Sequence, residues 1–516
     1  MSTHNRGRVV MLVDNKVEGD SRVQKEARSM AARGWDVVLL GRSPDRQTHR
    51  WQIGDAKVRL VPMPVPLLRP RHTFRRSPLR APLAYPAGPL ANYQRQHALA
   101  RRADARTRKD ELTRKLAEAP RDTPALRAER ALVWLNRAYA KARGELVELR
   151  VKQTEQLARS RQAMDAPLDV LATRFWRTTM GNRSWRRLDP NLWDWELAYG
   201  PVVDELAPDL IHANDFRMIG VGARAKLRAA AQGRTIRLVW DAHEFLPGRD
   251  VANVHPRWHE AQIAHEAEFV PYADAVVTTS EMMVELLGSA HRLPGTPAIV
   301  RNAPTVGLDS EVDTGPGVRA LCGLADDVPL LLYIGVTAPQ RGVDTMIEAL
   351  PRLDGVHVAL VAKQSPNLER LTSLAAELGV SDRVHPLPYV PVDHIVGHIA
   401  SVDVGVFPAL HNLSHDSDLP TKFYEYAQAH LPMVVSDVRT TAETTRMLGQ
   451  GEVFKAGDVE DYLRAVRAVL ADLPRYRKAY DEHPDLLAQW MWEPQADVLD
   501  AVYTRLLEPS SPDSRS

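Results

Sequence analysis

Two charged residues, Lys422 and Glu425, lie three positions apart in the segment DLPTKFYEYAQAHLPMVVSD, which runs from Asp418 to Asp437. Residues i and i+3 project from the same face of a helix, so a helix here holds the ammonium and the carboxylate side by side. A solvated surface ion pair is the ordinary interpretation. The alternative is a site for a nucleotide, because a lysine can hold a phosphate and a carboxylate can accept two hydrogen bonds from a ribose diol.

A second candidate for phosphate binding is Arg341, in the segment LYIGVTAPQRG. The segment predicts a strand, a glycine turn and a short loop that opens a helix. The start of a helix offers free N–H groups to a phosphate, and a guanidinium binds phosphate oxygens through two parallel hydrogen bonds. Loops of this kind are common, so the segment equally fits a loop without a ligand.

Further polar residues in the N-terminal half follow predicted strands. DLIHAND and WDAHE place four of them at the ends of consecutive strands: His212, Asp215, His243 and Glu244. Metal ligands usually come at close helical or turn spacing, so we expect the polar floor of a cleft and no metal. Gly19 and Asp20 open a helix on the same side. Asp20 also suits an N-cap, and Gly19 lets a ligand approach the backbone.

Strands alternate with helices of 10–15 residues in two separate series along the chain, at roughly 8–62 with 209–303 and from 328 onward. Such alternation predicts parallel sheets joined by crossover helices, so the fold class is α/β with two Rossmann-like, doubly wound domains. Ligands of such sheets lie beyond the carboxyl ends of the strands. The candidate residues therefore belong to one cleft that the two domains face.

Composition agrees with a large globular protein. The chain has 516 residues, of which 44% are hydrophobic and 26% charged, and a single cysteine, Cys322, which excludes an intrachain disulfide. The start of the chain predicts a strand and not a signal peptide, and no run of 18 apolar residues occurs. We therefore expect a cytoplasmic protein.

Charge is concentrated in one segment. Residues 69–195 hold 28 Lys and Arg against 13 Asp and Glu, a net charge of +15 in a chain whose total is +2. After a proline- and arginine-rich start, the segment predicts a helical hairpin at 92–119 and 124–164. A 3-4 apolar spacing suggests its seam: Leu132, Leu135, Tyr139, Ala142, Leu146 and Leu149.

Two interpretations of this basic insertion remain open. One is a surface whose tryptophans dock onto the body. The other is attachment to an anionic membrane surface, because cations favour anionic headgroups and tryptophan favours the interface. Nucleic acid is not expected, because no recognition motif accompanies the charge.

Taken together, seven segments in order resemble GT-B glycosyltransferases of family 4, the retaining transferases that use nucleotide-sugars. They are DSRVQKEARSMAARGWDVVLL, PDLIHAND, VWDAHE, IVRNAP, YIGVTAPQRGVDTMIEAL, DLPTKFYEYAQAHLPMVVSD and WEPQADVLDAVYTRLL. The resemblance covers roughly 8–61 and 206–507. It implies an N-terminal, acceptor-side domain at 1–305 that includes the 69–195 insertion, and a nucleotide-sugar domain at 306–480. A helix at 481–508 is then expected to cross back, before a disordered tail at 509–516.

The resemblance also implies roles for single residues. Glu425 matches the second Glu of the Glu-x7-Glu motif, which holds the donor ribose, whereas Ser417 stands at the first. This departure is shared by the branch whose motif reads Leu-Pro-x-Lys-x-x-Glu-Tyr. Lys422 and Arg341 match the residues that flank the diphosphate, and His243 matches the histidine of the first-domain cleft. A further basic residue is often found at the position of Val336.

The resemblance thus implies His243, Arg341 and Lys422 as catalytic residues. Donor binding is expected at Gly19, Arg341, Ser417, Lys422 and Glu425. The remaining cleft candidates are Asp20, His212, Asp215, Glu244 and Asn302. No metal or other cofactor is expected, because two cations can neutralise the departing diphosphate.

The implied activity is retaining transfer from a nucleotide-sugar to a cell-envelope, lipid-linked or other glycoconjugate acceptor. The enzyme is then expected in the cytoplasm, as a peripheral protein on the inner face of the cell membrane. An epimerase or phosphorylase on the same fold, and a non-catalytic adaptor, remain as alternatives, because a fold does not determine its reaction.

Overall fold

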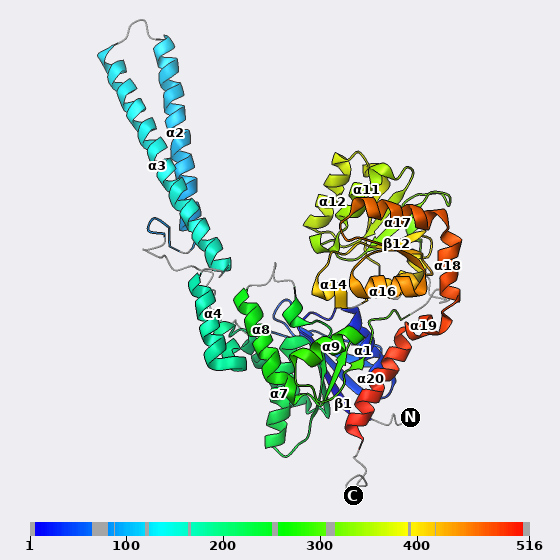
Figure 1. Cartoon of the computed structure of the whole chain (residues 1–516). Helices are drawn as coiled ribbons and strands as arrows, with labels where there is room; N and C mark the ends of the chain where they lie inside the picture. Colours follow the sequence, from blue (N-terminus) through cyan, green and yellow to red (C-terminus); the bar gives the residue numbers. More distant parts are fainter. Residues whose placement is uncertain are drawn as a thin grey trace. The chain divides into compact units, whose positions relative to one another are not determined.

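The computed structural model describes residues 6–63, 81–86, 88–118, 123–163, 167–249, 256–305, 315–390, 394–417 and 419–508. Contacts divide the chain into two compact units (Figure 1). The larger comprises Met1–Val65, Leu192–Asp250 and Gln262–Ser516, and the smaller comprises Pro66–Asn191 and Val251–Ala261. The proline- and arginine-rich segment at 64–80 and the expected tail at 509–516 lie outside the described residues.

The larger unit contains two lobes, each built on its own sheet. The sheet of the first lobe has the order β3-β4-β2-β1-β5-β6-β7-β8. All neighbours are parallel except β3, which runs antiparallel to β4 at the edge and was not predicted. The strands are β1 (Arg8–Leu12), β2 (Asp36–Arg42), β3 (Arg50–Ile53), β4 (Ala56–Val61), β5 (Leu210–Asn214), β6 (Arg237–Asp241), β7 (Ala275–Thr278) and β8 (Ala298–Ile299).

Four helices lie where the alternation predicts them: α1 (Ser21–Ala32), α7 (Asp215–Ala231), α8 (Pro256–Phe269) and α9 (Glu281–Ala290). Helix α6 (Leu192–Leu206), which precedes β5, was not predicted. Helix α1 shows why the local sequence folds this way. Asp20 accepts a hydrogen bond from the backbone N–H of Val23 as the N-cap, and Val23, Ala27 and Met30 bury one stripe against the sheet.

The sheet of the second lobe has the order β11-β10-β9-β12-β13-β14 and is parallel throughout. Its strands are β9 (Leu330–Ile334), β10 (His357–Val361), β11 (Val384–Leu387), β12 (Val404–Phe407), β13 (Met433–Ser436) and β14 (Gly451–Phe454). Its helices are α10 (Val318–Leu321), α11 (Asp344–Ala349), α12 (Pro366–Glu377), α13 (Ile395–Ile399), α14 (Leu413–Ser417), α15 (Thr421–Gln428), α16 (Arg439–Leu448) and α17 (Val459–Ala471).

Both faces of this second sheet are buried. Leu331 and Tyr333 of β9 enter one apolar core, with α11, α12 and α17, while Leu330 and Leu332 enter the other, with α13 and α15. Successive strand residues point to opposite faces, so strands covered on both sides are continuously apolar. The predicted α/β fold with two doubly wound, Rossmann-like domains is confirmed.

The end of the chain returns to the first lobe. After α18 (Leu473–Asp481) and α19 (Pro484–Gln489), helix α20 (Trp492–Leu507) packs into the core of the first lobe. Its buried side chains include Trp492, Leu499 and Tyr503, and the indole N–H of Trp492 donates to the Ser29 hydroxyl at 2.8 Å. The last helix therefore completes the apolar core that the first 300 residues begin.

The smaller unit is helical. It contains α2 (Leu90–Glu118) and α3 (Pro124–Ala163), which form the predicted hairpin, followed by α4 (Pro167–Met180) and α5 (Trp185–Leu188). The buried residues of α2 recur every seven positions: Ala91, Ala98, Ala105 and Leu112. On α3 the buried positions on the hairpin's inner side are Ala140, Gly144, Val147 and Val151. Small residues on both helices let them approach closely.

The predicted seam of the hairpin is wrong. The large members of that stripe, Leu132, Leu135, Tyr139, Leu146 and Leu149, are 48–62% exposed. The 3-4 spacing correctly indicates one face of a helix, but it does not say which neighbour that face meets. Alanines and a glycine give α2 and α3 a tighter contact on another face of α3, and the leucine stripe is left on the surface.

Candidate functional site

A cavity of about 420 Å³ opens between the two lobes of the larger unit, at the carboxyl ends of strands from both sheets. The first lobe contributes Ser21, His243, Glu244, Phe245, Met283 and Asn302. The second lobe contributes Ile334, Gly335, Val336, Arg341, Tyr389, Phe407, Ser414, His415, Ser417, Pro420, Thr421, Lys422 and Glu425. Most of the residues predicted from the sequence therefore meet in one place.

Lys422 is a buried cation without an ion pair to any described residue. The side chain is 9% exposed, and its ammonium lies 4.1 Å from the ring centroid of Tyr333. A Cβ at Gly335 would lie 3.3 Å from the ammonium, so glycine there leaves it room. Burial, and next the positive charge of Arg341, hold the pKa of Lys422 well below its usual value. Such a cation gains most from an incoming anion.

Glu425 projects from the same face of α15, as its spacing predicts. The carboxyl is 4% exposed, and burial raises its pKa to about 7 against the influence of Lys25 and Lys422. Lys25, from α1 of the first lobe, donates to Asn302 Oδ1 at 2.8 Å and to the Ala303 carbonyl at 2.5 Å. Burial, and next Arg22, lower the pKa of Lys25 to about 7. Cations from both lobes, Lys25 and Lys422, therefore stabilise the ionised form of Glu425.

Arg341 stands on a single 3₁₀ turn, Pro339–Arg341, and Gly342 ends that turn with a φ of +66°. A Cβ at Gly342 would lie 2.0 Å from the Pro408 carbonyl oxygen, so only glycine fits there. The turn places Arg341 in the lining of the cavity, which also includes Val336. The helix that this loop was predicted to open begins at Asp344 and is short, with six residues in α11.

His243 lies on the first-lobe side of the cavity between two carboxylates. Its Nε2 is 3.3 Å from Asp215 Oδ1 and its Nδ1 is 3.5 Å from Asp241 Oδ1. Burial favours the neutral ring, but Asp215 and Asp241 outweigh it and raise the pKa of His243 to about 10. At neutral pH the ring is therefore an imidazolium, which donates hydrogen bonds and does not accept protons.

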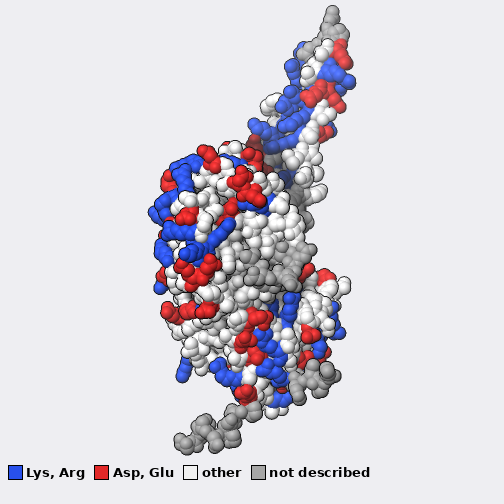
Figure 2. All heavy atoms as spheres, turned by 90° about the vertical axis from the view of Figure 1, so that its right-hand side faces the viewer, with Lys and Arg blue, Asp and Glu red and all other residues white. Residues whose placement is uncertain are grey.

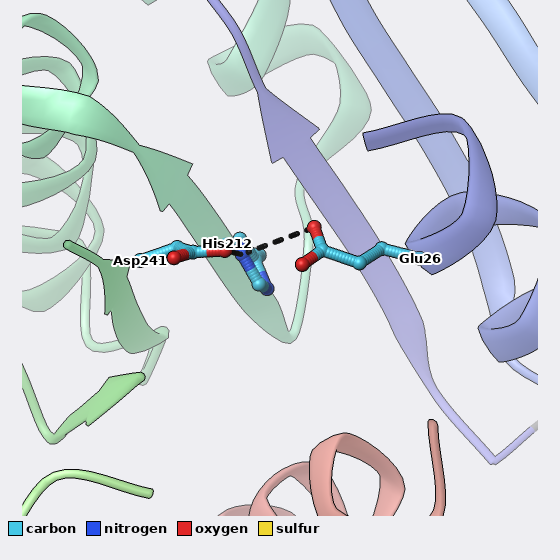
Figure 3. Close-up of side chains that lie close together, drawn as sticks. All are labelled: Glu26, His212 and Asp241. Atoms are coloured by element: carbon cyan, nitrogen blue, oxygen red, sulfur yellow. Dashed lines mark ion pairs between the residues drawn. The ribbon is translucent and has the colours of Figure 1, made fainter. Parts of the chain in front are cut away.

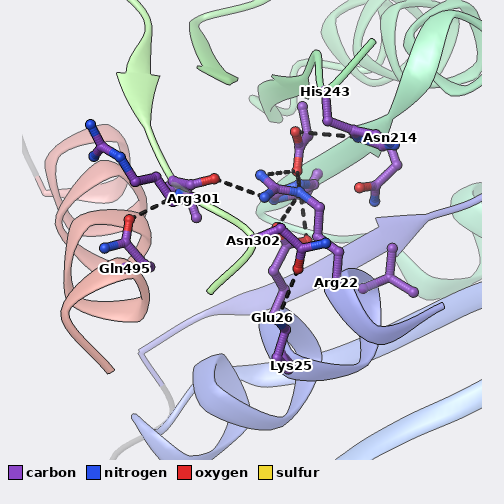
Figure 4. Close-up of polar contacts among 12 residues, drawn as sticks. Arg22, Lys25, Glu26, Asn214, His243, Arg301, Asn302 and Gln495 are labelled. Carbon is purple, nitrogen blue, oxygen red and sulfur yellow. Dashed lines mark hydrogen bonds and ion pairs between the residues drawn. The ribbon is translucent and has the colours of Figure 1, made fainter. Parts of the chain in front are cut away.

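A buried ion network lies beneath His243. Glu26, His212 and Asp241 lie close enough together to resemble a metal site (Figure 3). Arg22, however, reaches Glu26 at 3.1 Å and Asp241 at 2.8 Å, so its guanidinium is the counter-ion of both carboxylates. A divalent cation at that position would be repelled by Arg22. The ion pair with Arg22 also fixes Asp241, which lies 3.5 Å from the imidazole. Figure 4 shows Arg22, Glu26 and His243 of this network.

The remaining candidates divide into two groups. Ser417, Asn302 and Glu244 line the cavity. Asn302 Nδ2 also donates to Thr421 Oγ1 at 2.9 Å, and the Ser280 hydroxyl donates to the Ser417 carbonyl at 2.7 Å. These two hydrogen bonds join the lobes directly at the cavity.

Other candidates are not in the cavity lining. His212 as a cleft residue is wrong, because it is fully buried and its Nδ1 lies 2.5 Å from the Tyr503 hydroxyl. Asp20 is occupied as an N-cap and by Asn15 Nδ2 at 2.6 Å. Asp215 lies behind His243. Gly19 has a φ of +84°, and a Cβ there would lie 3.6 Å from Lys363 Nζ.

Sequence reasoning missed four groups in or beside the site. Lys25 stands in the middle of a helix and gives no local signal. His415, whose pKa is lowered by burial, lines the cavity from α14. Tyr389 lines it from the segment after β11, and Lys363 lies 5.8 Å from the Tyr389 ring centroid. Of these groups, Lys363 could have been predicted from the sequence, because it follows β10 at the carboxyl edge of the sheet, where ligands bind.

Comparison with known proteins agrees with this geometry. The chain matches the family models "Glycosyltransferase Family 4" at 153–303 and "Glycosyl transferases group 1" at 321–483. A D-inositol 3-phosphate glycosyltransferase of Geodermatophilus obscurus is 27% identical over 322 residues, which are 58% of this chain and 67% of the relative.

A second curated protein and a solved structure extend the comparison. A GDP-mannose-dependent alpha-(1-6)-phosphatidylinositol monomannoside mannosyltransferase of Mycolicibacterium smegmatis is 26% identical over 285 residues, covering 53% of this chain and 72% of the relative. Among solved structures, sucrose-phosphate synthase of Thermosynechococcus elongatus superposes with a TM-score of 0.60 at 15% identity, over 97% of this chain and 98% of the other.

Two facing Rossmann-like lobes with a polar cavity between them define the GT-B class of fold. The two family models together span more than half of the chain, and the chain belongs to the GT-B glycosyltransferases of family 4. It is accordingly a transferase that moves a sugar from a nucleotide-sugar donor to an acceptor.

Proposed function

We propose that the cavity binds the diphosphate of the donor between Arg341 and Lys422, and that Glu425 accepts hydrogen bonds from the donor ribose. The observation that carries the assignment is Lys422, a buried cation with no counter-ion among the described residues. A diphosphate supplies the missing negative charge, and the carboxylate three residues on lies where the attached ribose would follow.

We propose transfer with retention, by displacement on the front face of the sugar. The carboxylates that line the cavity in the described residues are Glu244 and Glu425. Glu425 is assigned to the ribose, and His243 is an imidazolium at neutral pH, so Glu244 and the leaving diphosphate are the groups left that could accept the proton. We assign the proton of the acceptor hydroxyl to the diphosphate, because a front-face displacement brings these two groups together. His243 donates a hydrogen bond to a hydroxyl oxygen of the transferred sugar and so helps to hold the sugar in place.

Arg341 and Lys422 also take the part that a metal ion plays in other transferases, because both stabilise charge on the departing phosphate. We therefore propose that transfer needs no metal or other cofactor. Ser417, in the place of the first motif glutamate, offers a neutral hydroxyl to the sugar. The hydrogen bonds from Ser280 and Asn302 across the cavity favour the closed arrangement of the lobes.

A donor screen tests these assignments. Thermal shifts with UDP- and GDP-sugars identify the donor, because a ligand that binds only the folded protein raises its Tm. Release of nucleotide should then depend on an acceptor. Arg341→Ala should reduce turnover at saturating donor more than it weakens donor binding, because leaving-group charge grows in the transition state. Unchanged turnover would refute the phosphate role, and a new nucleotide-sugar formed without acceptor would indicate an epimerase.

The acceptor is proposed to be a lipid-linked or cell-envelope glycoconjugate, met at the inner face of the cell membrane. No described helix is long and apolar enough to cross a bilayer. Support comes from a groove of about 650 Å³ on the hairpin, lined by Trp134 and by cations: Arg102, Arg106, Arg137 and Lys141. Figure 2 shows Lys and Arg side chains along this hairpin. Each cation near an anionic surface contributes about 1 kcal/mol, less in salt.

Sedimentation with vesicles tests this attachment. The protein should pellet with anionic vesicles and not with neutral ones, and high salt should release it. Replacing Arg102, Arg106, Arg137 and Lys141 by Ser should abolish pelleting. Four exposed cations of the second lobe, Arg439, Lys455, Arg464 and Arg467, serve as the matched control when replaced by Ser. Wild-type protein that stays in the supernatant at low salt would refute the membrane role.

A further inference from the structure

The outer face of α3 carries an apolar stripe whose large side chains are about half exposed, although the Tyr139 hydroxyl accepts a hydrogen bond from Arg143 and interacts with Arg101 of α2. Its large members are Leu132, Leu135, Tyr139, Leu146 and Leu149, between 48% and 62% exposed, and Ala142 lies among them. Single exposed leucines are common, but a continuous apolar stripe on a long helix marks an interaction surface. The helix itself has 40 residues, so the stripe lies on a straight support about 60 Å long.

The spacing of the stripe indicates that its partner is another helix. Intervals of three and four alternate from Leu132 to Leu149, and the same pattern extends back to Ala128 and Ala125, both exposed. A strict 3-4 repeat follows the a and d positions of a heptad, whose side chains fit into holes between the residues of a second helix. Helix α2 occupies another face of α3, through Ala140 and Val147. The outer face is therefore a second helix-packing seam.

The flanks of the stripe distinguish a protein helix from a lipid surface. A stripe that inserts into a membrane is bordered by cations. Here one border holds Glu129, Asn136, Arg143 and Arg150, and the other holds Ala131, Ala138, Glu145 and Lys152. The two borders together hold three cations, two carboxylates and three neutral residues, a mixture that occurs at the e and g positions of paired helices.

We propose that this stripe pairs with the same stripe of a second copy of the chain, in antiparallel orientation. A two-fold axis midway between Tyr139 and Ala142 sets each Tyr139 against Ala142 of the second copy, a large residue against a small one. Leu132 then meets Leu149 of the second copy, and Leu135 meets Leu146. A parallel pair would instead stack two tyrosines in one layer and two alanines in another, which fills space less well.

Charges agree with the antiparallel pair. In that register Glu129, which also pairs with Lys115 of α2, lies across from Arg150 of the second copy, which also donates to its own Leu83 carbonyl, and the two-fold axis repeats this pair at the other end of the stripe. Arg143 faces Asn136, and Glu145 faces Ala138. No two like charges oppose each other along the seam, so nothing electrostatic resists the pairing.

Sedimentation velocity without lipid tests the pairing. The wild-type chain of 57.7 kDa should shift to about twice that mass as its concentration rises. The double variant Leu135→Lys, Leu146→Lys should stay monomeric with unchanged helix content. The new lysines are exposed in the single chain, and pairing of the two stripes would bury their charge. Leu99→Lys, on α2 and 52% exposed, is the matched control and should dimerise normally. A wild type that stays monomeric throughout, or seam variants that dimerise like the control, would overturn the proposal.

Disulfide cross-linking tests the orientation. In a Cys322→Ser background, Leu132→Cys and Leu149→Cys are made separately with tags of different size and then mixed and oxidised. An antiparallel pair gives a disulfide between the two different chains. A parallel pair gives only disulfides between identical chains, which would overturn the proposed register. Sugar-transfer activity plays no part in either measurement, so failure here is distinct from failure of the proposed function.

Discussion

Replacing Lys422 by Met should separate binding from stability. Methionine keeps the length of the apolar stem beside Tyr333 and Phe407, and removes the charge. In the free enzyme that charge is buried and unpaired among the described residues, so its loss should leave the Tm equal or higher. With the donor bound, the same charge makes hydrogen bonds to phosphate, each worth about 1.5–3 kcal/mol. Donor affinity should therefore fall about ten- to hundredfold.

Calorimetry with UDP, GDP and their sugars measures the affinity, and scanning calorimetry of the free protein measures the Tm. Lys455→Met, at an exposed lysine of the same lobe, controls for the loss of one charge and should change neither. A fall in Tm together with unchanged affinity would refute the reasoning, because it would show that Lys422 serves the fold. Unchanged affinity alone would remove the diphosphate from this position.

Three further outcomes follow from the site. Because burial raises the pKa of Glu425 to about 7, its carboxylate form predominates above that pH and the acid form below it, so affinity for a nucleotide-sugar should rise as pH increases through about 7. Glu425→Gln should show weaker, pH-independent binding, and a wild-type affinity that is flat with pH would contradict this. Asp215→Asn removes a carboxylate that raises the pKa of His243, so the imidazolium of this variant should lose its proton at a lower pH than in the wild type, where the pKa is about 10. Turnover of the variant should therefore begin to decline at a lower pH than wild-type turnover. Identical pH–rate profiles would exclude the imidazolium from the reaction. Tyr503→Phe leaves the buried His212 ring without its hydroxyl partner and should cost about 1–3 kcal/mol in urea unfolding, whereas Tyr93→Phe, 61% exposed, should cost nothing.

The fold was largely predictable because its signals are local. Continuous apolar runs such as LLLYI mark strands buried on both faces, and the helices between them begin and end near the expected residues. The edge strand β3 was not predicted, because RWQI has no buried face and only its antiparallel neighbour makes it a strand. The face of α3 that packs against α2 was not predictable, because it depends on which face α2 can approach most closely. Local spacing along α3 does not contain that information.

The site was predictable where a residue follows a strand or stands at a characteristic spacing. Lys422, Glu425, Arg341 and His243 all met these conditions. Lys25 did not, because it reaches the site by crossing from the middle of α1 to Asn302. His212 met the condition and still proved to be a core residue, because Tyr503, almost 300 positions later in the chain, covers it. Contacts between distant segments leave no trace in local spacing.

The return of α20 to the first lobe has a consequence for the order in which the protein matures on the ribosome. The first lobe lacks Trp492, Leu499, Val502 and Tyr503 until the strands of the second lobe have been made. At typical synthesis rates of about 5–20 residues per second, the roughly 200 residues between β8 and the end of α20 take about 10–40 seconds. During that time the second lobe can complete its sheet first, while the first lobe waits with an open apolar face. The half of the enzyme that is synthesised first is therefore the half that finishes folding last.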